Sequence, residues 1–128
     1  MMKLLLLGVA ALAVTATPPA CNRNKQSTCF KARMEDRGMC GNFTISVLEG
    51  QLEGTEASWT NEQTGKVYTN VFRPANPCGI PEGIKNGDTF YFTLDTRKVE
   101  DCTHCMAFYP APASRINIRV QEGPCSGK

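Results

Sequence analysis

The sequence reads Val67-Tyr-Thr-Asn-Val-Phe-Arg-Pro74 and, after a loop, Thr89-Phe-Tyr-Phe-Thr-Leu94. β-branched and aromatic residues dominate both segments, and prolines or Asn-Gly-Asp bound them, so each predicts a β-strand. In the second segment Phe90, Phe92 and Leu94 lie on one face, which predicts a strand with one buried side.

The loop between these two strands is rich in proline and glycine and carries Cys78. Its composition excludes a helix, and its length excludes a tight hairpin turn. A cysteine in such a loop is expected to anchor it to another part of the chain by a disulfide.

Two other segments alternate between apolar and polar residues, as a half-buried strand does. Residues 43–49 would place Phe43, Ile45 and Val47 on one face. Residues 116–120 predict a last strand. Its inward residues are Ile116, Ile118 and Val120, and its outward residues are Arg115, Asn117 and Arg119.

The segment before the first of these alternating strands predicts a short helix. Ser27 would cap this helix, and Gly38 would end it after Arg37. Phe30 and Met34 would then share a helix face at positions i and i+4.

The segment 51–66 is polar and contains the single tryptophan of the chain, Trp59. A large aromatic side chain usually packs in the interior, so we assign Trp59 to the core. The alternative is that Trp59 forms the tip of a binding loop.

Residues 1–20 have the pattern of a secretory signal peptide. Lys3 gives a positive start, an uncharged apolar run follows, and small residues end it at Ala16 or Ala20. The apolar run is too short to span a membrane. Cleavage after Ala20 would make Cys21 the first residue of the mature chain. We therefore expect a secreted, extracellular protein with one disulfide-rich domain over residues 21–128.

The charge balance narrows the classes of partner. The 14 basic residues fall to 13 without Lys3, against 12 acidic residues. This near balance argues against nucleic acid and against an anionic membrane surface as partners. We expect the partner to be a secreted or cell-surface protein.

Seven cysteines follow the signal sequence. In a short secreted chain they predict a disulfide framework, whose pairing the sequence does not give. Because seven is odd, three bridges leave one cysteine, which is either a free thiol or the site of an intermolecular disulfide. The candidates are Cys21, Cys29, Cys40, Cys78, Cys102, Cys105 and Cys125.

Cys102-Thr-His-Cys105 contains a Cys-x-x-Cys motif and the one histidine of the chain, His104. In thiol redox enzymes this motif opens a helix within a βαβ unit, and the sequence has no such alternation, so we favour two structural cysteines that pair elsewhere. A zinc site is disfavoured because only one cysteine pair is close in sequence. We find no nucleophile motif, and we expect a non-enzymatic protein that holds no cofactor.

Asn42-Phe-Thr44 is a sequon for N-glycosylation. A glycan at Asn42 would suit a secreted glycoprotein. The alternative is that these residues only begin the strand at residues 43–49.

Several short strands, one short helix and cysteines near both ends predict an all-β domain. We expect a small, closed or half-closed antiparallel barrel that disulfides staple together, with one or two short helices. No internal repeat of roughly 20–50 residues occurs, which excludes a repeat architecture.

The central part of the chain resembles netrin-like domains of the kind found in tissue inhibitors of metalloproteinases. The resemblance covers about 60 residues, and it implies an OB-like, five-stranded barrel with disulfides. The similar elements are Tyr68-Thr69, Cys78-Gly79, Gly87 followed by Phe90-Tyr91-Phe92, Cys105 followed by Phe108-Tyr109-Pro110, and Cys125.

The resemblance also implies an inhibitory mechanism. In that family the N-terminal cysteine binds the catalytic zinc of the protease through its α-amino group and its carbonyl oxygen, and a disulfide to the Cys-Gly loop holds this cysteine in place. By similarity, Cys21 would bind the zinc of the target protease and Cys78 would be its disulfide partner. Asn22 and Gly79 would belong to the same target-binding surface. The mechanism requires Cys21 to be the first residue, because an acylated nitrogen is a poor ligand.

The resemblance therefore implies a secreted metalloproteinase inhibitor. The alternative is a secreted, non-enzymatic binding, effector or toxin-like protein that uses a similar disulfide-stabilised barrel without a protease target. A protease-inhibition assay separates the two hypotheses, as does N-terminal sequencing of the secreted protein.

Overall fold

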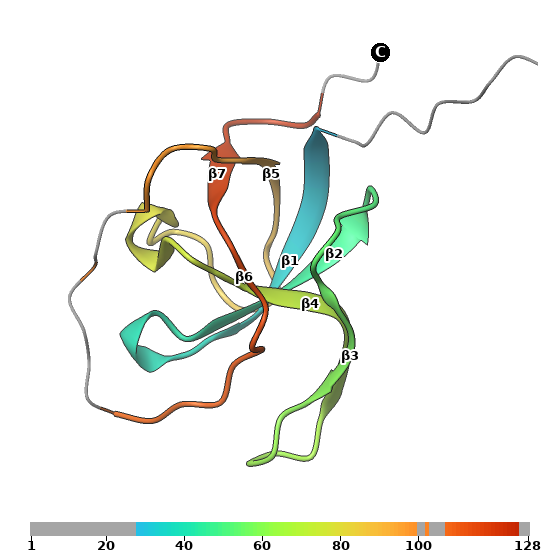
Figure 1. Cartoon of the computed structure of the whole chain (residues 1–128), viewed down its shortest axis with the longest axis vertical. Helices are drawn as coiled ribbons and strands as arrows, with labels where there is room; N and C mark the ends of the chain where they lie inside the picture. Colours follow the sequence, from blue (N-terminus) through green and yellow to red (C-terminus); the bar gives the residue numbers. More distant parts are fainter. Residues whose placement is uncertain (1–27, 100–101, 103–106, 126–128) are drawn as a thin grey trace, which may run out of the picture.

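The computed structural model of the protein describes residues 28–99, 102 and 107–125 (Figure 1). The expected signal peptide, Cys21, Asn22, His104 and Cys105 lie outside the described residues. The described chain is mainly antiparallel β-structure, with two short 3-10 turns and two disulfides between described residues. Its elements are β1 (Cys29–Arg37), η1 (Met39–Gly41), β2 (Phe43–Glu49), β3 (Glu56–Thr60), β4 (Val67–Pro74), η2 (Pro77–Gly79), β5 (Thr89–Leu94), β6 (Arg115–Ile116) and β7 (Ile118–Gln121).

The main sheet has the strand order β3-β4-β2-β1-β5-β7. All pairs along this order are antiparallel. The short strand β6 pairs with β4 in a parallel ladder through Arg73 and Arg115, and β7 follows it directly in the chain. The segment from β6 to β7 therefore connects β4, near one end of the sheet order, with β5 near the other end (Figure 1).

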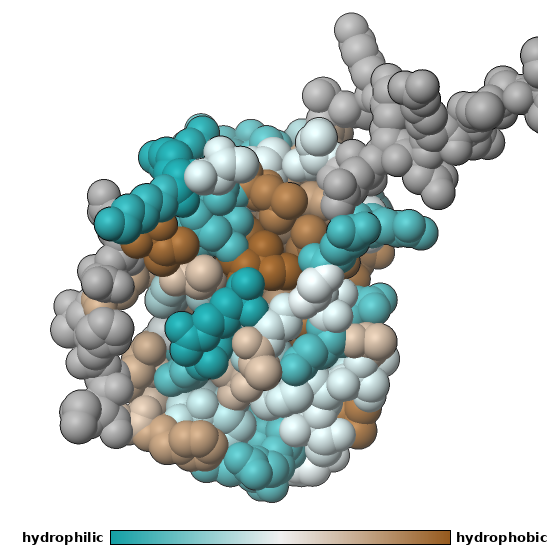
Figure 2. Space-filling view, in the orientation of Figure 1, coloured by the Kyte–Doolittle hydropathy of each residue, from teal (hydrophilic) through white to brown (hydrophobic). Residues whose placement is uncertain are grey.

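The sheet itself is not closed, so the expected barrel is present only in part. Figure 2 shows hydrophobic surface in an opening between β7 and the turn that follows β2. Several apolar residues pack against the core without being fully buried, as expected at an incompletely covered edge. These residues are Val47, Leu52, Ile84, Ile116 and Val120.

The core is built around the aromatic rings of Phe30, Phe72 and Phe92, each fully buried. The ring of Phe92 lies 5.2 Å from that of Phe30 and 5.6 Å from that of Phe72, measured between centroids. Burial of each such side chain contributes roughly 1.5–3 kcal/mol. These rings come from β1, β4 and β5, so the contacts between them link strands from different parts of the sheet.

Three of the predicted strands are confirmed, at residues 43–49, 67–74 and 89–94. Phe43 and Ile45 are buried as expected. The predicted inward face of the third strand is wrong at its end, because Leu94 is 42% exposed.

The predicted helix between Ser27 and Gly38 is wrong, because residues 29–37 form strand β1. Phe30 and Met34 are both fully buried, as a spacing of four residues allows in either structure. Ala32 is also fully buried, which only the two-residue period of a strand explains. β1 pairs with β2 on one side and β5 on the other, so it lies inside the sheet.

The predicted last strand is divided in two at Asn117. The side-chain amide of Asn117 donates hydrogen bonds to the carbonyl oxygens of Asp95 and Arg97, each at 3.0 Å. This contact leaves β6 to pair with β4 and β7 to pair with β5. Ile118 is buried as predicted, with 1% of its surface exposed.

Candidate functional site

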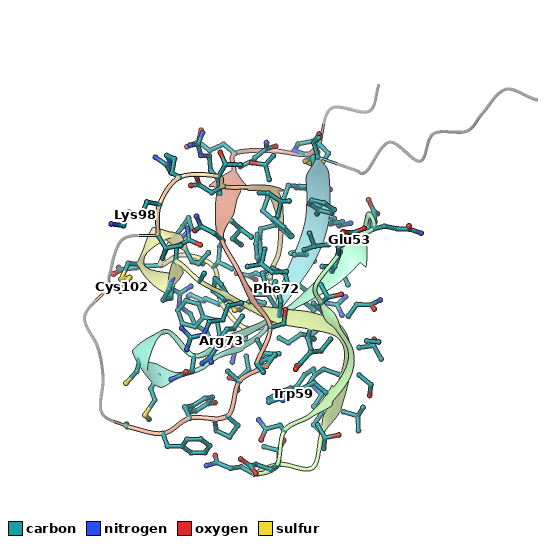
Figure 3. All side chains as sticks on the ribbon, viewed as in Figure 1. Glu53, Trp59, Phe72, Arg73, Lys98 and Cys102 are labelled. Atoms are coloured by element: carbon teal, nitrogen blue, oxygen red, sulfur yellow. A yellow bond between two sulfur atoms is a disulfide. The ribbon has the colours of Figure 1, made fainter. Side chains whose placement is uncertain are left out.

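A cleft of about 930 Å³ opens on the surface, and we call it the main cleft. It lies where the η1 turn, the β3–β4 hairpin and the segment before β6 meet. Figure 3 places Arg73 above Trp59, with the chain that leads into β6 running beside both. The cleft is lined by residues 40–42, 59, 60, 62, 73–75, 77, 99, 102, 107–111 and 115.

One wall of the main cleft is held by Tyr109. Its hydroxyl group donates a 2.6 Å hydrogen bond to a carboxylate oxygen of Asp36 on β1. This hydrogen bond, together with burial, raises the pKa of Tyr109 above the ordinary tyrosine value. The Tyr109 ring packs against Gly38, where a side chain would collide with the ring. The segment 107–111 therefore has a fixed position beside the η1 turn.

The floor of the main cleft carries two arginines that are partners in the parallel β4–β6 ladder, Arg73 and Arg115. The side chain of Arg73 donates a 3.1 Å hydrogen bond from Nη1 to Oδ1 of Asn42. Its Nε is buried and has no hydrogen-bond partner among the described residues. Burial lowers the pKa of Arg73, and the charge of Arg115 lowers it further. The guanidinium group of Arg73 stays protonated at neutral pH.

Besides Tyr109, the aromatic side chains that line the main cleft are Trp59 and Phe108. Trp59 lies on the edge strand β3 and stacks on Tyr68 of β4, with 5.9 Å between the ring centroids. It is half-buried and is not part of the core cluster, so its assignment to the core is wrong. Phe108 is 73% exposed. Phe108 lies in a proline-rich segment between strands, and this position in the sequence could have indicated a binding residue.

Sequence patterns do not identify Arg73 and Arg115 as site residues. They indicate only that Arg115 lies on the outer face of a strand, and they give Arg73 no role. The two residues are far apart in sequence, and a parallel ladder between β4 and β6 brings them together. No local pattern predicts a parallel pairing between distant segments.

The expected Cys21–Cys78 disulfide is wrong, because Cys78 is bonded to Cys102. The Cα atoms of this pair lie 6.0 Å apart, within the range that a disulfide spans. Cys102 thus pairs outside its Cys-x-x-Cys motif, as the structural interpretation of that motif predicted. The Cys78-Gly79 turn is exposed and still anchored by a disulfide, but from a different part of the chain.

Next to this turn lies a smaller pocket of about 330 Å³. Asp95 lies in its wall, and both oxygens of its carboxylate accept hydrogen bonds from the guanidinium of Arg97. These hydrogen bonds hold the pKa of Asp95 well below its usual range. Figure 3 shows Cys102 and Lys98 on this side of the molecule, near η2. The pocket is lined by Asn76, Cys78, Gly79, Asp95, Arg97, Lys98, Val99, Cys102 and Asn117.

The sequon residue Asn42 lies in the wall of the main cleft. Its side-chain nitrogen donates a 3.1 Å hydrogen bond to the carbonyl oxygen of Met39, and its side-chain oxygen accepts the hydrogen bond from Arg73. An N-linked glycan at this position would therefore stand beside the cleft. Glycosylation of Asn42 stays a prediction.

The other expected disulfides are found in part. Cys29 is bonded to Cys125, with 5.7 Å between their Cα atoms. Cys40 is also disulfide-bonded. In the described ranges no group of three or more His, Cys, Asp or Glu side chains is arranged to hold a metal ion. None of the helices in those ranges is long and apolar enough to cross a membrane.

Comparisons with known proteins gave no match, whether to protein-family models, to curated proteins or to solved structures.

Proposed function

We propose that the protein is a secreted, non-enzymatic binding protein whose main cleft receives part of a secreted or cell-surface protein. The observation that carries this proposal is the composition of the cleft. It combines exposed aromatic surface from Trp59 and Phe108 with two positively charged guanidinium groups. Aromatic and arginine side chains dominate the energetics of protein recognition. Arginine keeps its proton at neutral pH, so these two groups suit recognition of charge and do not suit proton transfer.

The rigidity of the cleft walls supports the same proposal. Tyr109 is fixed by its hydrogen bond to Asp36, and Arg73 by its hydrogen bond to Asn42. The disulfide from Cys78 to Cys102 ties the chain that borders the cleft to the η2 turn. A site whose walls are already ordered loses less conformational entropy on binding. Disulfides and a leader resembling a signal peptide both suit an extracellular protein.

The strand connectivity supports an OB-like interpretation of the fold. β1 pairs with both β2 and β5, while β4 pairs with β2 and, in parallel, with β6. This arrangement corresponds to a partly open Greek-key barrel of the OB type. In OB-folds the loop after the first strand and the loop before the last strand contribute to ligand sites. The corresponding segments here, η1 and residues 107–111, both line the main cleft.

The test is to select, from a library of displayed peptides, those that bind the mature protein. Calorimetry then measures their affinities. We expect selected peptides to bind wild type, and the substitution Phe108→Ala to weaken binding about tenfold or more, since buried aromatic anchors commonly contribute this much. Phe108 is largely exposed, so its removal leaves the core intact. Val67→Ala is the matched control, because Val67 is 57% exposed and lies outside the cleft. Peptides that bind both variants equally well would show that the main cleft is not the binding site.

The metalloproteinase inhibitor stays a second candidate, since the exposed Cys78-Gly79 turn and the OB-like connectivity both agree with the resemblance. The Cys78–Cys102 disulfide means that Cys78 does not hold Cys21, so a zinc-binding N-terminus would need a different anchor. Inhibition assays on a panel of zinc metalloproteinases should compare the chain that begins at Cys21 with one extended by a single alanine. Zinc binding by the N-terminal cysteine predicts inhibition by the first chain alone. Equal inhibition by both chains would rule this mechanism out.

A further inference from the structure

The guanidinium group of Arg73 has donors that the protein does not use. One of its nitrogen atoms, Nη1, donates to Asn42, whereas the buried Nε has no partner among the described residues. A buried donor without a partner is unfavourable, and in native proteins such an atom calls for an explanation, such as a bound water, a bound ion or a functional role. Arg73 is partly exposed and lines the main cleft, so its guanidinium group lies beside a space that a ligand can enter.

Arg115 doubles the positive charge at the same place. Arg73 and Arg115 are direct partners in the parallel ladder, so their side chains leave the same face of β4 and β6. In the described part of the chain, no carboxylate forms an ion pair with either arginine. The carboxylate of Asp36 is hydrogen-bonded to Tyr109, and the cleft residue Glu62 is exposed. Two adjacent like charges without a counterion favour the binding of an anion.

The neighbouring apolar surface defines which anion fits. Trp59 and Phe108 line the same cleft as the two arginines. A simple inorganic anion would make no apolar contact with these rings. The terminal residue of a peptide carries a carboxylate and a side chain on the same carbon atom, so one residue can contact both kinds of surface. A carboxylate also accepts two parallel hydrogen bonds from a guanidinium group.

We propose that Arg73 and Arg115 bind the C-terminal carboxylate of a partner peptide whose last residue is apolar. The apolar side chain lies against Trp59 and Phe108. This inference rests on the proposed binding function and names the chemical group that the cleft recognises. It predicts a partner whose free C-terminus is accessible.

The single tryptophan of the chain gives a direct optical readout, because Trp59 lines the main cleft. The probe is N-acetyl-phenylalanine, titrated at constant ionic strength while tryptophan fluorescence is recorded. We expect a saturable change in fluorescence. N-acetyl-phenylalaninamide, which lacks the negative charge, should bind at least about tenfold more weakly, because hydrogen bonds to charged groups contribute this much or more. Acetate, which carries the carboxylate without the aromatic ring, tests whether the carboxylate alone is sufficient for binding.

Arg115→Gln should weaken binding of N-acetyl-phenylalanine about tenfold or more and leave the amide unaffected. Arg115 is exposed, so this substitution removes charge without opening the core. Arg119→Gln on β7 changes the net charge equally at a position outside the cleft, and it should bind like wild type. Arg73→Lys keeps the charge but removes the planar fork, and it should lose affinity for the carboxylate.

The outcomes separate this inference from the proposed function. Equal binding of the acid and the amide, or no saturable change with the acid, overturns the carboxylate site. If displayed peptides still bind in a way that depends on Phe108, the binding function stands without it. A peptide amide extended by several residues that binds as well as the free acid would show that the cleft recognises internal segments instead.

Discussion

Gly38 has no side chain, so the Tyr109 ring can pack against it and hold one wall of the main cleft in place. Its backbone angles, φ −68° and ψ 159°, are open to any residue, so glycine is required here for packing alone. A Cβ atom would collide with the Tyr109 ring and with the carbonyl oxygen of Asn42. We expect Gly38→Ala to lower the free energy of unfolding by about 1–3 kcal/mol, because an aromatic ring and a backbone group must both move.

Urea unfolding followed by circular dichroism measures this effect. Gly83→Ala is the control, since a Cβ atom there meets nothing within 4 Å. The control should change the free energy of unfolding by no more than about 0.5 kcal/mol. Equal midpoints for the two variants would contradict the packing of Tyr109 against Gly38.

Tyr109 predicts a pH dependence. Its pKa is raised, mainly by the hydrogen bond to Asp36. The neutral hydroxyl is therefore favoured in the folded state. This contribution to stability is fully present below the pKa of an unfolded tyrosine, about 10, and is lost as the pH rises towards the folded pKa.

Ultraviolet titration of the three tyrosines should show one that ionises at higher pH than in the unfolded chain. Asp36→Asn removes the negative charge and keeps a hydrogen-bond acceptor, so it should lower the pKa of Tyr109. Tyr91→Phe removes a different tyrosine from the titration and should leave the late step in place. A late step that survives in Tyr109→Phe would contradict the assignment.

Among the elements, Asn117 divides what the sequence predicts as one strand. The alternation of Ile116, Ile118 and Val120 indicates a continuous strand, whereas the amide of Asn117 binds two carbonyl oxygens of the connection after β5. Asn117→Val should restore strand propensity and still destabilise the protein by about 1–3 kcal/mol, because the two hydrogen bonds to the carbonyl oxygens of Asp95 and Arg97 are lost. Thr69→Val on the exposed part of β4 tests propensity alone, and it should not destabilise. Urea unfolding compares the two variants, and a stabilised Asn117→Val would show that the break is incidental.

The strands that the sequence predicts are those with one clearly buried face. Phe43 and Ile45, or Phe90 and Phe92, alternate with less apolar neighbours, and a period of two identifies a strand. The sequence of β1 also fits a helix, because the spacing of Phe30 and Met34 suits both the helix period and the strand period. The edge strand β3 was not predicted, since it pairs only with β4 and shows no buried face.

The residues of the candidate site are harder to predict from the sequence than the strands of the fold. Trp59 drew attention as the single tryptophan, but its stacking on Tyr68 at a sheet edge depends on the pairing of β3 with β4. The neighbouring positions of Arg73 and Arg115 depend on a pairing between distant segments. The resemblance implies Cys21 as the partner of Cys78, whereas the structure pairs Cys78 with Cys102. Contacts of this kind follow from topology, which local patterns do not encode.

For the whole molecule, the two disulfides between described residues close loops of very different length. Cys29 and Cys125 are separated by 96 residues, and Cys78 and Cys102 by 24. In the chain-entropy model, the first bridge contributes about 5 kcal/mol and the second about 3 kcal/mol. Replacing Cys29 and Cys125 together by serine should therefore lower the melting temperature more than replacing Cys78 and Cys102. Calorimetry on both double variants measures this, and the reverse order would contradict the model.

The Cys29–Cys125 bridge also determines how the protein responds to mechanical force. Figure 1 shows the start of β1 and the end of the described chain together at the top, while β3 and residues 107–111 lie at the bottom. Tension applied between the two ends passes through the covalent bond, so the hydrogen bonds of the sheet are not pulled apart. A protein tethered at either end would then present the main cleft away from its anchor, and tension between the two ends would leave the sheet intact.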